Sequence, residues 1–462
     1  MYITKYFITH KLPSGRNILV NTLTGSVDYV PPHVIGQMEK GIFTETDGLE
    51  EIMLRKKGYL FDSPGEERKQ IDAFYRKEEE ESGQKPYVFV FCLTYACNLR
   101  CFYCFEDDYH QTESVLTEDD MDKITGFMER LIGKDSDRPF RVVLEGGEPF
   151  LEHREEILED FLKKMNGLAA RYRGFCGVTV FTNGENTLSY LEMMKRYAGI
   201  IERVLITLAG PAKVHNLYRV SVSGKGNYEK AVTATSVLLQ NGIRVHTVLN
   251  LDKNNIHCLP EISDELHRCG WNEKENYLGC YVSSIKYFDS KYAGDALSEY
   301  AVWKAILDFA GRGELDAGLF HLGDMKHLKS VDRLIRCGRP RFHNCAAADG
   351  KQYLFGPDGL IYNCTKVTAN KEYSIGGYRE EAGAELEEEK VKWWKTGTGQ
   401  GSGPCGDCRY AFICGGKCRY EEDRLGFRPE VCQGNMENLC RLYLDHLETG
   451  NCPVPQDIIY DN

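Results

Sequence analysis

Apolar runs alternate with amphipathic stretches between residues 87 and 285. The runs are rich in β-branched and aromatic residues, as buried strands are, and they lie at residues 87–93, 140–144, 176–181, 203–208, 243–249 and 277–284. The stretches between them carry apolar residues at helical spacing and lie at residues 118–132, 155–165, 188–197, 228–240 and 260–268. Six strands that alternate with helices predict a parallel sheet, curled into a barrel or part of one.

The first 84 residues predict a separate module. Short strand-like runs at residues 2–9, 17–21 and 26–30 precede helical stretches at residues 31–39, 46–57 and 64–81. Three strands with three small helices resemble a winged-helix unit. An exposed strand edge in such a unit can accept an extended peptide as an added strand. A folded cap without a ligand is the alternative.

Charge and composition restrict the possible partners. The net charge of −12 argues against nucleic acid or an anionic membrane as the main ligand. The sequence has no apolar run of 18 residues and no secretory signal pattern at its start, so we expect a cytoplasmic protein. In a reducing compartment, 18 cysteines are metal ligands or buried thiols rather than a disulfide framework. None precedes Cys92 and ten lie from Cys337 onward, which indicates separate modules.

Three cysteines follow the first predicted strand of the barrel. Cys97, Cys101 and Cys104 have the spacing CxxxCxxC. A compact loop can direct three thiolates at one centre, and thiolates select iron–sulfur clusters, zinc or copper(I). Half of a zinc site or a group of buried thiols is the alternative. Because the loop follows a strand, it lies at the carboxyl edge of the sheet, where barrel enzymes place their working residues.

Polar or glycine-rich segments follow the next strands at the same edge. The second strand leads into Gly146-Gly147-Glu148, where bare backbone allows close approach and the carboxylate can receive an ammonium group. The motif is short and also suits a tight turn. Later strands end near Thr207 and Asn250, and isolated polar residues at such places are usually caps.

Together these residues resemble the radical S-adenosylmethionine (SAM) superfamily. The resemblance implies a partial (β/α)6 barrel over residues 85–290 and a [4Fe–4S] cluster on Cys97, Cys101 and Cys104. The cluster's vacant iron would bind SAM and cleave it to a 5′-deoxyadenosyl radical, so these three cysteines are also the predicted catalytic residues. The implied SAM contacts are Tyr103, Gly146, Gly147, Glu148, Thr207, Arg219 and Asn250. Relatives often carry Asp where this chain has Ala209, which puts an acid–base role for that loop in doubt.

The later cysteines resemble a SPASM extension over residues 337–462, which follows a helical linker at residues 291–336. This extension holds two auxiliary [4Fe–4S] clusters in enzymes that modify peptides and proteins. The resemblance implies an outer cluster on Cys405, Cys408, Cys414 and Cys432, and an inner cluster on Cys345, Cys364 and Cys418. Cys440 is the rival of Cys432. The fourth ligand of the inner cluster is either Cys337 or an open site, and a pair of zinc ribbons is the alternative for the whole block.

The N-terminal module resembles the recognition element that binds the leader of ribosomally made precursor peptides. The implied function is thioether formation between a cysteine sulfur and a carbon of the same peptide, with a flavodoxin or ferredoxin as electron donor. Other crosslinks, epimerisation and oxidation remain open. Formylglycine formation, as in sulfatase maturation, is disfavoured because Thr365 stands where those enzymes usually carry Asp, and because they lack the N-terminal module.

Overall fold

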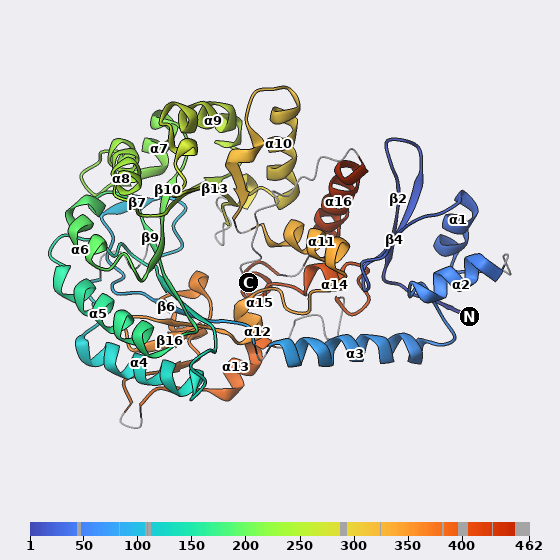
Figure 1. The fold of residues 1–462 in the computed structure, drawn as a ribbon, viewed down its shortest axis with the longest axis horizontal. Coiled ribbons are helices and arrows are strands. Elements are labelled where there is room, and N and C mark those ends of the chain that lie inside the picture. The colour runs from blue at the N-terminus through green and yellow to red at the C-terminus, as the bar shows by residue number, and fades with distance from the viewer. Residues whose placement is uncertain are drawn as a thin grey trace.

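The computed structural model describes residues 1–43, 48–82, 84–106, 109, 112–286, 293–323, 325–380, 383–395, 405–426 and 428–448. Within them, a mixed sheet has the strand order β14-β13-β12-β10-β9-β8-β6-β15-β16-β17-β18 (Figure 1). Its central strands are β6 (Tyr87–Phe91), β8 (Phe140–Leu144), β9 (Phe175–Thr182), β10 (Ile201–Leu208), β12 (Val245–Leu251) and β13 (Tyr277–Ser284). All neighbours among these six are parallel, so the predicted α/β alternation and strand order are confirmed.

The predicted helices cover this sheet. They are α4 (Glu118–Ile132), α5 (Glu155–Arg171), α6 (Leu191–Arg196), α8 (Tyr228–Gln240) and α9 (Leu259–Arg268). Thr117 caps α4 with a capping box, and Gly133 ends it. The rings of Phe91 on β6 and Phe161 on α5 pack edge to face at 5.1 Å, and both side chains are fully buried. The core of the domain therefore lies between the sheet and these helices.

The sheet extends beyond the six predicted strands at both ends. β14 (Phe320–Leu322) adds parallel to β13, and β15 (Gln352–Phe355) adds parallel to β6. β15 then continues into the antiparallel strands β16 (Leu360–Tyr362), β17 (Gly376–Gly377) and β18 (Glu385–Leu386). These strands are two to four residues long, too short to show a clear alternation. The sheet therefore crosses the predicted boundaries at residues 290 and 337.

The N-terminal module differs from the prediction in its first strand. The run at residues 2–9 is split: β1 (Tyr2–Ile3) pairs with β5 (Leu60–Phe61), whereas β2 (Phe7–Lys11) pairs with β3 (Asn17–Asn21), which pairs with β4 (Val27–Tyr29). The prediction of a single strand was wrong because the chain turns at Tyr6, whose side chain contacts a segment that is distant in the sequence. The module's helices are α1 (Pro32–Lys40), α2 (Gly48–Lys56) and α3 (Pro64–Ser82).

Helix α3 joins the N-terminal module to the barrel. Its 19 residues span about 28 Å, and Figure 1 shows it running along one side of the molecule between the two parts. The remaining helices are α7 (Ala212–Tyr218), α10 (Glu299–Gly311), α11 (Lys326–Cys337), α12 (Ala346–Asp349), α13 (Glu388–Lys395), α14 (Ala411–Cys414), α15 (Arg419–Leu425) and α16 (Pro429–Glu448). No helix in the described part of the chain is long and apolar enough to cross a membrane.

The N-terminal module docks on the cysteine-rich segment at residues 405–414. The ring of Tyr6 packs on Phe412 at 4.8 Å, and its hydroxyl donates to the Gly406 carbonyl at 3.2 Å. Lys5 pairs with Asp407 at 2.7 Å. The Thr22 hydroxyl donates to the Arg409 carbonyl. The module is therefore anchored to the backbone of the segment that carries Cys405, Cys408 and Cys414.

A bidentate ion pair ties the last part of the sheet to the barrel. Arg379 donates twice to the Asp120 carboxylate on α4, both at 2.7 Å, and the Asp120 side chain is only 3% exposed. Burial alone raises the pKa of Asp120, but the hydrogen bonds from Arg379 and Thr117 outweigh it and leave the pKa lowered. A depressed folded pKa stabilises the fold above pH ~4, and this contribution is lost as pH falls through the folded pKa.

We expect Arg379→Met to lower the free energy of unfolding at pH 7 by about 2 kcal/mol, because it leaves a buried carboxylate without its charged donor. The matched control is Arg173→Met, which removes an equally short bidentate pair with Asp137 in which both side chains are more than 60% exposed. The control should leave the free energy of unfolding almost unchanged, because water screens an exposed ion pair. Urea unfolding at pH 7 and pH 3 measures both variants. Equal losses, or a loss for Arg379→Met that persists undiminished at pH 3, contradict the assignment.

Candidate active site

The CxxxCxxC loop is held by a two-stranded antiparallel ribbon beside the barrel. β7 (Leu99–Cys101) pairs with β11 (Arg219–Ser221), and the register sets Cys101 opposite Arg219. Residues opposite each other in such a ribbon point to the same face, so the Arg219 side chain is brought to the cysteines. Cys101 and Arg219 are each 7% exposed. Cys101 and Arg219, which are more than 100 positions apart in the sequence, are therefore direct neighbours in the ribbon.

Tyr103, Arg219 and Asn250, three of the predicted SAM contacts, lie together in the structure. The Arg219 guanidinium donates to the Tyr103 hydroxyl at 2.9 Å. Burial raises the pKa of Tyr103, while hydrogen bonds with Arg219 and Asn250 act in the opposite direction. Arg219 is itself near the thiols of Cys97 and Cys101, which help to raise its pKa. Tyr103 of the turn after β7, Arg219 of β11 and Asn250 of β12 therefore converge at the cysteine loop. Thr207 lies half-buried near the end of β10, opposite Val248. Its position near the end of this strand puts it at the same edge of the sheet as the cysteine loop.

The two glycines of the Gly-Gly-Glu segment are required by close packing. Gly147 has φ +52°, and a Cβ there would lie 2.4 Å from the carbonyl oxygens of Thr94 and Ala96. Gly146 has φ +98°, and a Cβ there would lie 2.4 Å from the Cys92 sulfur. The segment is thus pressed against the chain that leads into Cys97, where only glycine fits.

Glu148 is buried and held by donors from the next strand. Its carboxylate accepts hydrogen bonds from the Thr182 hydroxyl and the Asn183 backbone N–H, both at 2.7 Å, and from the Phe150 N–H at 3.0 Å. Burial raises its pKa, and these bonds lower it again without cancelling the rise. Arg219 contributes in the same lowering sense. Glu148 is fixed in orientation, and its charge is felt at Cys97, whose pKa it helps to raise.

Glu106 and Asn183 join the site without having been predicted. The Glu106 carboxylate accepts from the Gly147 N–H at 2.8 Å and so links the cysteine loop to the Gly-Gly-Glu segment. The Asn183 side chain donates to Asn98 at 2.7 Å and approaches the Cys97 sulfur at 3.9 Å. The sequence gives only weak signals for these two residues: Glu106 is an acid two residues after Cys104, and Asn183 stands at the end of the third strand.

The three thiols suit a shared cluster. Burial is the main cause that raises the pKa of Cys97 to about 12 and that of Cys104 well above its usual value, and the nearby Cys101 thiol contributes to both shifts. Ligation needs thiolates, so binding of a cluster here must release protons. Soft thiolate donors in this number match an iron–sulfur cluster with one iron left open to a further ligand.

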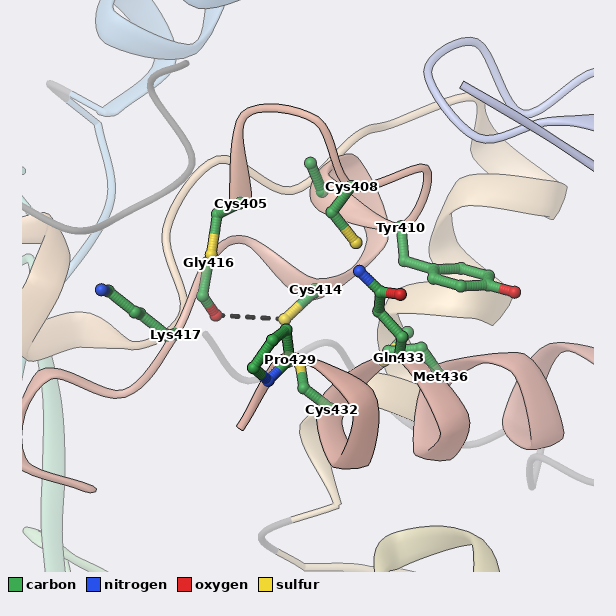
Figure 2. Close-up of a pocket in the computed structure, with 11 residues that line it drawn as sticks. Cys405, Cys408, Tyr410, Cys414, Gly416, Lys417, Pro429, Cys432, Gln433 and Met436 are labelled. Carbon is green, nitrogen blue, oxygen red and sulfur yellow. Dashed lines mark hydrogen bonds between the residues drawn. The ribbon is translucent and has the colours of Figure 1, made fainter. Parts of the chain in front are cut away.

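Four later cysteines line one pocket. Figure 2 shows the sulfurs of Cys405, Cys408, Cys414 and Cys432 turned toward a common space, with Pro429 and Met436 beside them. The pKa of Cys414 is lowered well below its usual value, chiefly by a hydrogen bond with Cys432 and also by His327. Cys440 lies eight residues further along α16 and is buried in the apolar core. The structure thus brings Cys432, rather than Cys440, to the other three.

Three more cysteines form a second group. Burial, together with the neighbouring thiols of Cys345 and Cys418, raises the pKa of Cys364 to about 12. Cys337 is exposed and ends α11, whereas the start of that helix, at Lys326, is close to Cys414 and Cys418. Cys337 lies 11 positions, about 16 Å, along α11 from Lys326. The thiols that act on Cys364 are those of Cys345 and Cys418, and Cys337 is not among them.

Arg341 joins the two cysteine groups. Its guanidinium donates to the carbonyl of Asn344, directly before Cys345, and to the Ser330 hydroxyl at 2.7 Å. Its backbone N–H donates to Phe412, and a Cβ on Gly415, next to Cys414, would lie 2.9 Å from its Cγ. Burial lowers the pKa of Arg341, while the thiols of Cys414 and Cys345 act to raise it. One buried cation thus contacts both segments.

Among the described residues, no three His, Cys, Asp or Glu side chains surround a point at the distances of a single metal ion.

A cysteine loop at the carboxyl edge of a parallel sheet, next to a glycine-lined cradle and a buried arginine, defines a barrel enzyme that handles a cluster and a small cofactor. Residues 91–266 match the model of the radical SAM superfamily. The chain is therefore an enzyme that carries a radical SAM domain over these residues. This family implies a [4Fe–4S] cluster and SAM, and the residues described above are suited to both.

Sequence and structure comparisons give similar relatives. A cysteine-type anaerobic sulfatase-maturating enzyme of Clostridium novyi (strain NT) is 23% identical over 377 residues, covering 74% of this chain and 89% of that protein. The structure of anSMEcpe with bound AdoMet and the Cp18Cys peptide has a TM-score of 0.56 and 15% identity, and covers 79% of this chain and 99% of the other. Streptococcus suis SuiB bound to its precursor peptide SuiA has a TM-score of 0.52 and 13% identity, and covers 93% and 98%. At these identities the solved structures show a common fold.

Proposed function

We propose that this enzyme modifies a ribosomally made precursor peptide, and that it forms thioether bridges from cysteine sulfur to a carbon of the same peptide. When bound, the cluster and SAM supply the 5′-deoxyadenosyl radical. Cys97, Cys101 and Cys104 hold the cluster, Glu148 and the bare backbone of Gly146 and Gly147 receive the methionine end of SAM, and Tyr103 with Arg219 and Asn250 lines its nucleoside side. The observation that carries the site assignment is the convergence of these residues from four separate segments.

The two later cysteine groups support a SPASM extension with two auxiliary clusters. Cys405, Cys408, Cys414 and Cys432 are the proposed ligands of the outer cluster, and Cys345, Cys364 and Cys418 those of the inner one. The exposed position of Cys337 favours an open fourth site on the inner cluster. An open iron can bind and orient the substrate sulfur. The reaction also needs an electron acceptor, because joining S–H and C–H into C–S leaves one electron after hydrogen abstraction and loss of the thiol proton; an auxiliary cluster can accept it.

The N-terminal module supports a precursor peptide as the substrate. A cleft runs along β2, lined by Thr9, His10 and Lys11, by Ile35 and Glu39 of α1, and by Arg441 of α16. β2 is an outer strand of the sheet β2-β3-β4, where an extended leader segment can add. Binding of the leader raises the effective concentration of the core segment at the barrel. SuiB, which is described with its precursor peptide, matches 93% of this chain, compared with 79% for anSMEcpe.

Formylglycine formation is the second candidate, because a sulfatase-maturating enzyme of Clostridium novyi aligns with most of the chain. Thr365 after Cys364 and the docked N-terminal module argue against it. The same site residues and clusters also serve carbon–carbon or carbon–oxygen crosslinking, epimerisation and oxidation. The products of these reactions distinguish them from thioether formation.

Mass spectrometry of cysteine-rich precursor peptides encoded beside this gene, co-expressed with the enzyme, tests the proposal. We expect the peptide to lose two hydrogen atoms per bridge, with one cysteine per bridge no longer alkylatable. Loss of two hydrogens with every cysteine still alkylatable indicates another crosslink. A product that reacts with an aldehyde probe indicates formylglycine instead. Unchanged mass with all candidate peptides, while SAM is cleaved, contradicts peptide thioether formation.

A further inference from the structure

Two helices of the predicted linker lie beside the pocket that is lined by Cys405, Cys408, Cys414 and Cys432. We call this pocket the outer pocket. Helix α11 packs against α14, which ends at Cys414, and both α10 and α11 pack against α16, which carries Cys432. At the start of α10, the Tyr300 N–H donates to the Asn435 side chain of α16 at 3.4 Å. The linker helices are therefore part of the surroundings of the outer pocket.

His327, the second residue of α11, reaches the sulfur of Cys414. Its Nε2 lies 3.7 Å from the Cys414 Sγ. The thiol hydrogen of Cys414 is directed at the Gly416 carbonyl at 3.1 Å (Figure 2), so the sulfur accepts from the imidazole. A cysteine that ligates a cluster is a thiolate, which has no hydrogen and can only accept. In both states the hydrogen between the two groups therefore belongs to the Nε2 of His327.

Glu299 holds the other side of the same ring. Its carboxylate accepts from the His327 Nδ1 at 2.9 Å and from the His327 backbone N–H at 3.0 Å. The Glu299 side chain is only 7% exposed, and it begins α10, where the helix N-terminus favours a carboxylate. The two hydrogen bonds fix both the backbone and the ring of His327. The imidazole thus donates at both ends, to a carboxylate on one side and to the cysteine sulfur on the other.

A donor to a ligand sulfur changes the reduction potential of a cluster. Reduction adds negative charge, part of which spreads onto the ligand sulfurs, so an N–H directed at a sulfur stabilises the reduced form more than the oxidised form. The His327 side chain is only 19% exposed, and the low local dielectric strengthens such a bond. Lys326, the preceding residue, places a further positive charge near Cys414. The surroundings of Cys414 therefore favour the reduced state.

We propose that His327, oriented by Glu299, raises the reduction potential of the outer cluster through its hydrogen bond to the Cys414 sulfur. The raised potential makes this cluster a better acceptor for the electron that bond formation leaves over. In that step the cluster gains one electron, the substrate loses it, and no atom is transferred. His327 is a positioning residue and not a ligand. This inference rests on the proposed function, since it assumes that the outer cluster is present.

The test is an anaerobic redox titration of the reconstituted full-length enzyme, followed by electron paramagnetic resonance. The signal of the outer cluster is the one that disappears in the Cys405→Ala variant. We expect His327→Leu to shift the equilibrium of this cluster at least tenfold toward the oxidised form, a fall in potential of about 59 mV for one electron. His327→Gln, whose amide can still donate to the sulfur, should recover part of this shift. Both variants should keep the iron content of the wild type, because no ligand is removed.

His343→Leu is the matched control. The His343 side chain is 22% exposed, compared with 19% for His327, and its Nε2 pairs with the Asp349 carboxylate at 3.5 Å. It should shift the equilibrium of the outer cluster by less than about twofold.

Three outcomes overturn the proposal. They are a wild-type potential in both His327 variants at full iron content, an equal shift in His343→Leu, and a loss of about four irons from both His327 variants, which would show that His327 is needed to hold the cluster. A failure of the proposed function gives a different result. In that case the wild type itself holds only about eight irons per chain, or Cys405→Ala removes no signal, so the outer cluster and its tuning are refuted together.

Discussion

The Cys101→Ala enzyme is expected to release no 5′-deoxyadenosine above background, with dithionite or with a protein donor. Cys101 pairs with Arg219 in the ribbon through backbone hydrogen bonds, which alanine preserves. The substitution therefore removes one cluster ligand and leaves the local fold in place. After anaerobic reconstitution, the iron content should fall by about four per chain, from about twelve for three [4Fe–4S] clusters.

Cys258→Ala is the control for this variant. Cys258 is another buried cysteine of the barrel, 5% exposed, and has no proposed ligand role. It should keep full iron content and full SAM cleavage, at a cost in stability of about 1 kcal/mol. Retention of SAM cleavage by Cys101→Ala, or zinc in place of iron in the wild-type loop, contradicts the assignment of the CxxxCxxC loop.

The Gly147→Ala enzyme is expected to bind SAM about a hundredfold more weakly, which corresponds to about 2.8 kcal/mol. The new Cβ would lie 2.4 Å from two backbone oxygens, those of Thr94 and Ala96, which cannot move as a flexible side chain can. The segment must shift away from the chain leading into Cys97. That shift strains the hydrogen bonds from the Gly147 N–H to Glu106 and from the Glu148 N–H to Ala96, and so displaces the Glu148 carboxylate.

Gly133→Ala separates this clash from backbone strain. Gly133 also has a positive φ, +73°, but a Cβ there has nothing within 4 Å. It should lose about 1 kcal/mol of stability and keep the wild-type affinity for SAM. Equilibrium dialysis of SAM against the reconstituted enzymes measures the difference, with iron content as a check that the cluster is retained. Equal affinities in the two variants contradict a role of Gly147 in the SAM cradle.

Several proposed interfaces depend on contacts between distant parts of the chain. The N-terminal module bonds to the backbone beside Cys405 and Cys408, and Arg341 contacts both later cysteine groups. Neither arrangement follows from a local pattern. Tyr6 and Arg341 carry no motif, and their importance comes only from the segments that they meet.

The sequence alone determined the features that depend on near neighbours along the chain. The alternation of apolar and amphipathic stretches was enough to predict the six parallel strands and their helices, because hydrophobic periodicity is a local property. The spacing of Cys97, Cys101 and Cys104, directly after a strand, was enough to predict a thiolate metal site, and the family resemblance added the expectation of an iron–sulfur cluster. The pair Gly146 and Gly147 was likewise recognised from its place after the second strand.

Only the tertiary structure decided which distant residues meet. It set Arg219 opposite Cys101, added Glu106 and Asn183 to the site, and grouped Cys432 with Cys405, Cys408 and Cys414 while leaving Cys337 apart. It also extended the sheet with β14 and β15, whose three or four residues are too short for a periodic signal. The physical reason is common to all of these: strand pairing and packing join residues tens to hundreds of positions apart, and their partners are selected by the global fold rather than by the adjacent sequence.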